Sequence, residues 1–161
     1  MNKFPQLILH NPFALILLMA MFSVTALFYW QGHQGFSLMD EGFLWYGAQR
    51  VMAGEIPIRD FMAYDIGRYY WSAAIMSLMG DNGIVALRIS AAVFQALALF
   101  IGVAMLARSQ SHKNHLYWLL ALFTLMVWMA EQFRIFDIAI PIMLVGALSY
   151  LIEKPSCRRY L

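Results

Sequence analysis

The sequence predicts an all-α integral membrane protein with about four transmembrane helices. Of its 161 residues, 62% are hydrophobic and 12% are charged, which is roughly half the charged fraction of a soluble domain. Four apolar segments also meet or approach the length of about 20 residues that crosses the hydrocarbon core of a bilayer. We therefore expect a single membrane domain over residues 1–161. The four predicted spans are residues 13–30, 83–107, 116–130 and 135–152.

The first span, residues 13–30, contains no charged residue. Lys3 precedes it, and the residues that end at Ala26 would pass as a signal-peptidase site. The apolar run nevertheless continues to Trp30 through two further aromatic residues, which is typical of an aromatic belt at the lipid headgroups. We therefore predict an uncleaved anchor.

The connection between the first two spans, residues 31–82, is predicted to contain two short interfacial helices. Ser37 to Asp40 resembles a capping box with Asp in place of Glu, and helix-compatible sequence runs from there to Ala53. A second apolar stretch, residues 69–79, is too short to span and ends at a strong turn signal. The first helix has an apolar face suited to a membrane surface. That face consists of Leu44, Ala48 and Val51.

The last two spans differ in length. Residues 116–130 form a short segment, which needs its flanks or the interior of the bundle to complete a crossing. Residues 135–152 contain Pro141, which predicts a kink whose freed carbonyl is satisfied by neighbouring helices.

The distribution of Lys and Arg predicts the orientation in the membrane. Both termini and the connection at residues 108–113 contain basic residues, whereas residues 31–82 hold six acidic residues and three arginines. With four crossings, we expect both termini in the cytoplasm and the long loop outside, in a bacterial inner membrane. The six acidic residues are Asp40, Glu41, Glu55, Asp60, Asp65 and Asp81.

Several classes of partner and cofactor are excluded by composition. A formal charge of +2 with dispersed bases does not indicate a nucleic-acid partner. Cys157 is the one cysteine, which excludes an internal disulfide and a cysteine-based metal cluster. The four histidines have no metal-site spacing. We therefore predict no metal site from the residues themselves.

Three acidic residues are candidates for chemistry. Asp40 and Glu41 open the first loop helix, where the helix dipole alone would favour them. Asp137 lies one turn into an apolar span, where a charge is expensive unless it is paired or faces a wet cavity. Arg134, three residues earlier, could be its local partner. Alternatively, Asp137 faces Asp40 across a cavity at the outer surface.

Arginines are the candidates for binding an anionic substrate. Arg88 lies near the outer end of the second span, where it could extend to the interface or bind a phosphate with its planar guanidinium group. Further candidates for substrate binding are Arg59, Arg68 and Arg134.

Three groups of residues form a recognisable pattern. The first is Asp40-Glu41-Gly42 with the run Tyr46–Phe61, the second is Tyr64–Trp71, and the third is Ala86-Leu87-Arg88 with the helix opening at Arg134 and Asp137. Together they resemble the GT-C class of membrane glycosyltransferases, which includes protein O-mannosyltransferases and the aminoarabinose transferases of lipid A. The resemblance extends over nearly the whole chain. Ile66 stands where the family usually has Pro.

The resemblance implies a sugar transferase of the cell envelope. Its donor would be a polyprenyl-phosphate-linked sugar, used at the outer face of the lipid bilayer. Asp40 would be the general base that takes a proton from an acceptor hydroxyl or amine, with Glu41 in support and Asp137 as a second acid. Arg88 or a divalent metal would stabilise the charge of the departing lipid phosphate.

Members of this class usually have more transmembrane helices than this chain. We therefore expect residues 1–161 to be the N-terminal portion of a larger fold, inactive alone or completed by another chain. The alternative is a small non-catalytic four-helix membrane protein, such as a flippase for lipid-linked sugars or an assembly subunit.

Overall fold

The computed structural model describes residues 11–109, 115–129 and 135–153, and within these ranges the chain forms six helices and no strand. The predicted all-α class is therefore confirmed. The helices are α2 (Pro12–Gln31), α3 (Glu41–Met52), α4 (Ile66–Met79), α5 (Ile84–Ser109), α6 (His115–Trp128) and α7 (Ile135–Glu153).

The ends of α2, α5, α6 and α7 agree with the four predicted spans to within two residues. Two of these helices, α2 and α5, are long and apolar enough to cross a membrane. The apolar parts of α6 and α7 are shorter. By length and composition, the coarser prediction of membrane-crossing helices therefore holds for two of the four segments.

Local sequence signals explain where α2 begins. The Asn11 side chain accepts a hydrogen bond from the backbone N–H of Phe13 at 3.1 Å, and Pro12 occupies the first turn. An Asn cap satisfies a backbone donor that the helix leaves free, and proline is well tolerated at the first helical position.

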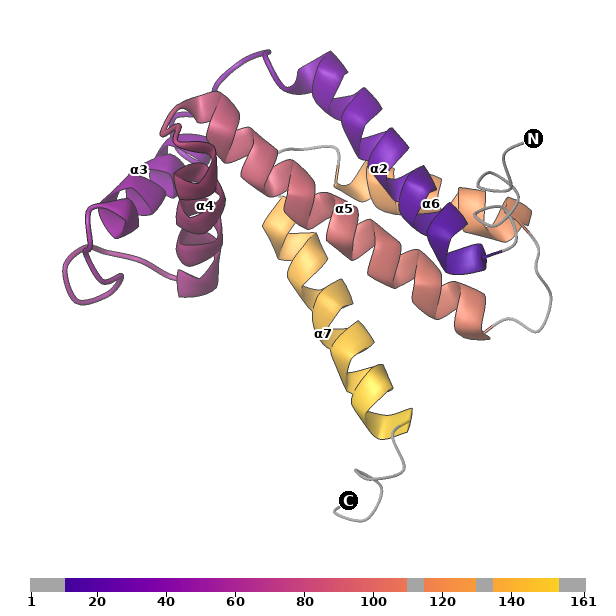
Figure 1. Ribbon diagram of the computed structural model, residues 1–161. Helices are drawn as coiled ribbons and strands as arrows, with labels where there is room; N and C mark the ends of the chain where they lie inside the picture. Colours follow the sequence, from indigo (N-terminus) through magenta and orange to yellow (C-terminus); the bar gives the residue numbers. More distant parts are fainter. Residues whose placement is uncertain (1–10, 110–114, 130–134, 154–161) are drawn as a thin grey trace.

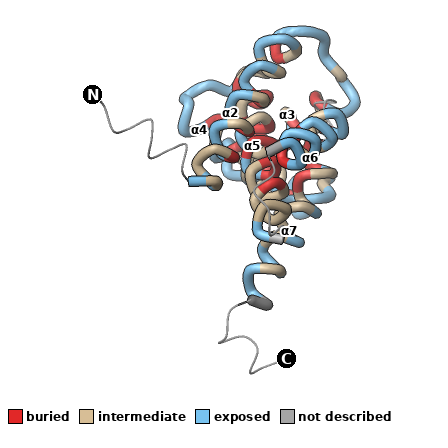
Figure 2. Tube along the Cα trace, turned by 90° about the vertical axis from the view of Figure 1, so that its right-hand side faces the viewer, coloured by how far each residue is buried: buried red, intermediate tan, exposed pale blue. Residues whose placement is uncertain are grey.

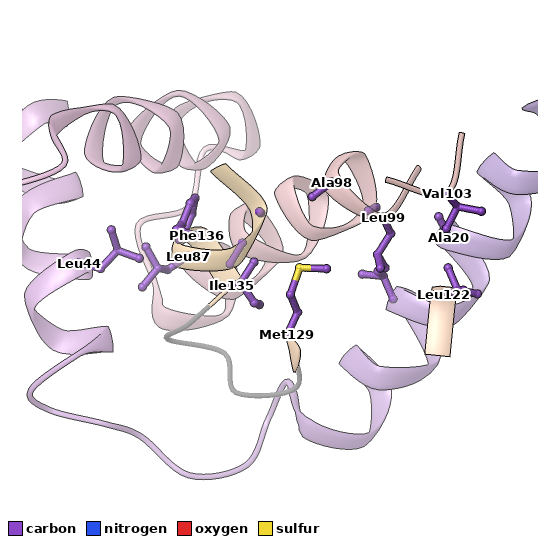
Figure 3. Close-up of a cluster of buried hydrophobic side chains, with 14 of the residues drawn as sticks. Ala20, Leu44, Leu87, Ala98, Leu99, Val103, Leu122, Met129, Ile135 and Phe136 are labelled. Carbon is purple, nitrogen blue, oxygen red and sulfur yellow. The ribbon is translucent and has the colours of Figure 1, made fainter. Parts of the chain in front are cut away.

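Helix α5 is the centre of the fold (Figure 1) and contacts α2, α4, α6 and α7. Its buried face is rich in alanine, which lets neighbouring helices approach closely. Figure 3 shows Leu87 of α5 beside Phe136 of α7, and Val103 of α5 beside Ala20 of α2. The second half of α7 still packs on α5, since Gly146 lies against Ile101 and Met105, and its other side exposes apolar side chains. The C-terminal end of the described helix projects beyond the other helices (Figures 1 and 2).

Helices α3 and α4 pack against each other at one end of α5 (Figure 1). The apolar face of α3 that was predicted to rest on a membrane surface is turned inward, since Leu44 and Ala48 are buried in the core cluster together with Tyr69 of α4. That part of the interfacial-helix prediction is wrong because a partner helix from the same loop covers the face. Helix α3 is also joined to the turn before α5, since Trp45 Nε1 donates to the Asn82 carbonyl at 2.6 Å.

Helix α4 begins at Ile66, three residues earlier than the predicted stretch 69–79. The residue before it, Asp65, has left-handed backbone angles (φ 51°, ψ 53°). Polar contacts fasten α4 to α5, because Trp71 Nε1 donates to the Ser90 carbonyl at 2.9 Å. The loop between the first two long helices is therefore a folded unit, and it positions the acidic residues Asp40, Glu41 and Asp65.

Candidate functional site

A cavity of about 520 Å³ lies where the loop before α3 meets α2, α3, α4, α5 and α7. Its volume falls in the range of small-molecule sites, about 300–1,000 Å³. The wall combines apolar side chains with six charged ones. The charged residues are Asp40, Glu41, Asp65, Arg68, Arg88 and Asp137. The structure thus brings the three predicted acids and two of the four predicted arginines to one place.

Asp40 lines this cavity with an exposed side chain. Its carboxylate accepts a hydrogen bond from the Ser37 hydroxyl at 3.0 Å and does not cap the helix. Among the described residues, Asp40 has no cation within ion-pair distance. A carboxylate that is not held in an ion pair remains able to accept a proton.

Glu41, the next residue, is buried and forms an ion pair. It is 7% exposed, and its carboxylate accepts from Arg88 Nε and Nη2, each at 2.8 Å. It also accepts from the Ser37 backbone N–H at 3.0 Å. The predicted capping box therefore forms with Glu41 as the reciprocating acid in place of Asp40. Glu41 supports Asp40 by fixing the turn that presents it.

Arg88 is a buried clamp, which corrects its predicted role in binding phosphate. Besides Glu41, it donates to the carbonyls of Gly32 at 2.9 Å and Gly35 at 2.6 Å. Four of the five N–H groups of its guanidinium are thus engaged, and the residue is 6% exposed. The sequence suggested a free Arg near a helix end because these partners lie 47 to 56 residues away.

Arg68 connects two acids of the cavity. Its Nη2 pairs with Asp65 in the same helical turn and with Asp137 of α7 at 3.4 Å. Asp137 thus lines the same cavity as Asp40, the residue it was predicted to face, and its ion partner among the described residues is Arg68. The predicted local partner, Arg134, lies outside the described residues.

Arg59 does not reach the cavity, which counts against its predicted role. Its Nε and Nη2 donate to Asp60 at 2.9 and 2.8 Å, and these hydrogen bonds lower the pKa of the Asp60 carboxyl to about 2. Asp60 also accepts from the Ile56 backbone N–H at 2.8 Å. Arg59 thus takes part in holding an exposed turn of the loop.

Two residues of the site were missed from sequence. Asp65 was counted only as one of the acids of the loop, and Tyr69 only as part of the apolar stretch 69–79 and of the run Tyr64–Trp71. Tyr69 is fully buried and lines the cavity, yet its hydroxyl has no hydrogen-bond partner among the described residues. Burial raises the pKa of this hydroxyl, so it is protonated at neutral pH. The one signal in the sequence that could have pointed to Asp65 was its place shortly before the apolar stretch 69–79.

The cavity is acidic overall. Among the described residues, four carboxylates and two guanidinium groups line it, which gives this part of the wall a formal charge of −2. Across the described ranges, no group of three or more His, Cys, Asp or Glu side chains is arranged to hold a metal ion. The divalent metal suggested by the family resemblance therefore has no set of ligands in this part of the chain.

Comparison of the chain with profiles of known protein families, with curated proteins and with solved structures found no match. What the cavity does must therefore be argued from its own residues.

Proposed function

We propose that this chain is a membrane glycosyltransferase of the GT-C type, which transfers a sugar from a polyprenyl-phosphate donor to an acceptor hydroxyl or amine. One observation supports this most strongly. Asp40, a carboxylate without an ion pair among the described residues, lies in one cavity with Asp137 and Arg68, which come from distant parts of the chain. A base that faces a cavity lined with both donors and acceptors suits acceptor activation.

In the proposed reaction Asp40 accepts the proton of the acceptor O–H or N–H group. The acceptor atom then forms a bond to the anomeric carbon, and the bond from that carbon to the phosphate oxygen breaks. Its electron pair leaves with the lipid phosphate. General base catalysis of this kind contributes about 10²- to 10⁴-fold to the rate.

The charge of the cavity decides where the parts of the donor lie. The formal charge of −2 on its described wall disfavours a phosphate inside it, and four of the five N–H groups of Arg88 are occupied. We therefore place the sugar in the cavity and the phosphate at its rim, at the level of the lipid headgroups. Arg134 remains a candidate for the phosphate from its sequence position alone.

Asp40→Asn is expected to lower transfer by at least 100-fold, because the amide cannot accept the proton. The assay is transfer from a radiolabelled polyprenyl-phosphate sugar by membranes that contain the full chain. Asp81→Asn is a matched control, since Asp81 lies in the turn before α5, away from the cavity, and Asn can still accept its hydrogen bond from the Gly83 N–H. The control should keep activity within about twofold.

Wild-type turnover by the Asp40→Asn variant would remove Asp40 as the base. A wild-type chain that inserts normally but transfers no sugar would contradict the proposal that residues 1–161 are active by themselves. That result would favour the alternative of a non-catalytic four-helix protein, such as a flippase or an assembly subunit.

The proposal includes four crossings of a bacterial inner membrane, with both termini in the cytoplasm and the α3–α4 unit outside. Met62, whose side chain is 79% exposed in that unit, provides the test. In a Cys157→Ser background, Met62→Cys should react with a membrane-impermeant maleimide in intact cells. Cys157 in the otherwise unaltered chain should react only after the membrane is permeabilised. The opposite labelling pattern would reverse the orientation.

A further inference from the structure

We infer that the cavity is a subsite for an uncharged sugar ring, in which Arg68 Nε and the Tyr69 hydroxyl donate hydrogen bonds to oxygens of the sugar. This inference rests on the proposed function and goes further, because it names the class of sugar. The experiment below separates its failure from that of the transferase proposal.

The first observation is a pair of buried donors without acceptors. Among the described residues, four buried side-chain polar atoms have no hydrogen-bond partner. Two of them, on Arg50 and Glu55, belong to one ion pair. The other two are Arg68 Nε and the Tyr69 hydroxyl, which are neighbours on α4 and whose residues both line the cavity. Buried donors nearly always have an acceptor. Both atoms are closed off from the cavity space by the side chains around them, so a ligand oxygen reaches them when those side chains shift.

The acceptors lie close by. Asp65 and Asp137 both contact Arg68, and their side chains are 54% and 59% exposed. A sugar hydroxyl can donate one hydrogen bond and accept two. It can therefore accept from Arg68 or Tyr69 while it donates to one of these carboxylates. A phosphate offers no hydrogen to the carboxylates in its ionised form, so a polyhydroxyl ligand fits this set of groups better.

Aromatic rings complete the subsite. Tyr64 and Phe43 both line the cavity and stack on each other, with ring centroids 5.4 Å apart. The Tyr64 side chain is 58% exposed, which leaves ring surface available to a ligand. The apolar C–H face of a pyranose can cover such a ring, while its hydroxyls reach the polar groups of the cavity.

The charge of the cavity selects among sugars. Its formal charge of −2 repels a sugar that bears a carboxylate, whereas a neutral ring avoids this repulsion. We therefore expect a neutral hexose to bind and the corresponding hexuronic acid to be rejected.

The test uses the full chain in lipid nanodiscs and two probes, a short-chain prenyl phosphate that bears a neutral hexose and the same lipid that bears the hexuronic acid. We expect the hexose probe to bind at least tenfold more tightly. Asp137→Asn should narrow this difference, because it removes one negative charge from the cavity. Equal binding of both probes, or no binding of the hexose probe, would overturn the inference.

Tyr69→Phe tests the hydroxyl directly. It should weaken binding of the hexose probe by about 3- to 10-fold, as expected for one lost hydrogen bond. The melting temperature should be unchanged or higher, since no described residue is a hydrogen-bond partner of the hydroxyl. Tyr70→Phe is the matched control, because Tyr70 is the next residue on α4 and does not line the cavity. It should leave binding unchanged.

The outcomes separate the two proposals. A lower melting temperature of Tyr69→Phe with unchanged hexose binding would show that the hydroxyl only stabilises the fold, and would overturn the subsite. Selective binding of the hexose by a chain that transfers nothing would uphold the subsite and contradict the transferase. Transfer that depends on Asp40 but does not discriminate between the two sugars would uphold the transferase and contradict the subsite.

Discussion

Glu41→Ala is expected to destabilise the fold by about 3–5 kcal/mol, which corresponds to a fall in melting temperature of roughly 10 °C for a chain of this length. Arg88 is 6% exposed, and within the described part of the chain Glu41 supplies the one carboxylate that it contacts. Removal of the acid leaves a guanidinium charge buried without a counter-charge, which is far more costly than the loss of an exposed ion pair.

The pair also determines where Asp40 lies. Through Arg88, the loop carbonyls of Gly32 and Gly35 and the first residue of α3 are all fastened to α5. Glu41→Ala should therefore also disturb the turn that presents Asp40. We expect faster proteolysis of the loop after α2, in addition to the lower melting temperature.

Glu55→Ala is the matched control, because Glu55 pairs with Arg50 and both side chains are partly exposed, at 29% and 37%. Its cost should be about 0–1 kcal/mol. The double variant Glu41→Met with Arg88→Met should recover part of the loss by removing both charges. Recovery should be incomplete, since two loop carbonyls lose their donor. The measurement is thermal unfolding by circular dichroism in one detergent, and equal costs for Glu41→Ala and Glu55→Ala would contradict the clamp.

Gly47→Ala is expected to destabilise the α3–α4 unit by about 1–3 kcal/mol, the usual cost of overpacking. A Cβ at this position would overlap the Tyr69 ring and come within 3.3 Å of Phe61. The ring cannot retreat easily, because Tyr69 is fully buried and also contacts Phe43 and Phe61 edge to face. In an open helix the same change would stabilise by about 1 kcal/mol.

Gly67→Ala provides that open position in the neighbouring helix. No atom lies within 4 Å of a Cβ built there, so this change should be neutral or stabilising by up to about 1 kcal/mol. A Tyr69→Leu background should reduce the cost of Gly47→Ala, as expected for two residues in direct contact. If Gly47→Ala melts at or above the wild-type temperature, the close packing of α3 on α4 is wrong.

The sequence predicted where most helices begin and end, but it did not predict which side chains pair with one another in the folded chain. Long apolar runs gave the ends of α2 and α5 almost to the residue, because apolar length and nearby turn residues are local properties. The start of α4 was missed, since Ile66 follows a left-handed Asp65 that no simple start signal marks.

The candidate site shows the same difference between what local sequence signals predict and what contacts between distant residues decide. Asp40 and Asp137 were singled out as acids in unusual positions, and the structure places both in one cavity. Arg88 was assigned to substrate although it is a buried clamp, and Tyr69 was overlooked. Burial and pairing decide these roles, and both depend on residues far away in the chain.

The sequence by itself determined an all-α chain, the places of its helices and the concentration of acidic residues in one loop. These properties follow from composition and from signals a few residues apart. Only the tertiary structure decided which acids are free and which are neutralised. Arg88 forms an ion pair with Glu41, which lies 47 residues away in the sequence, and Arg68 forms one with Asp137, which lies 69 residues away. Asp40, in contrast, has no cation beside it among the described residues. Whether a carboxylate can work as a base depends on its neighbours in space, because a nearby charge or buried donor changes its readiness to accept a proton.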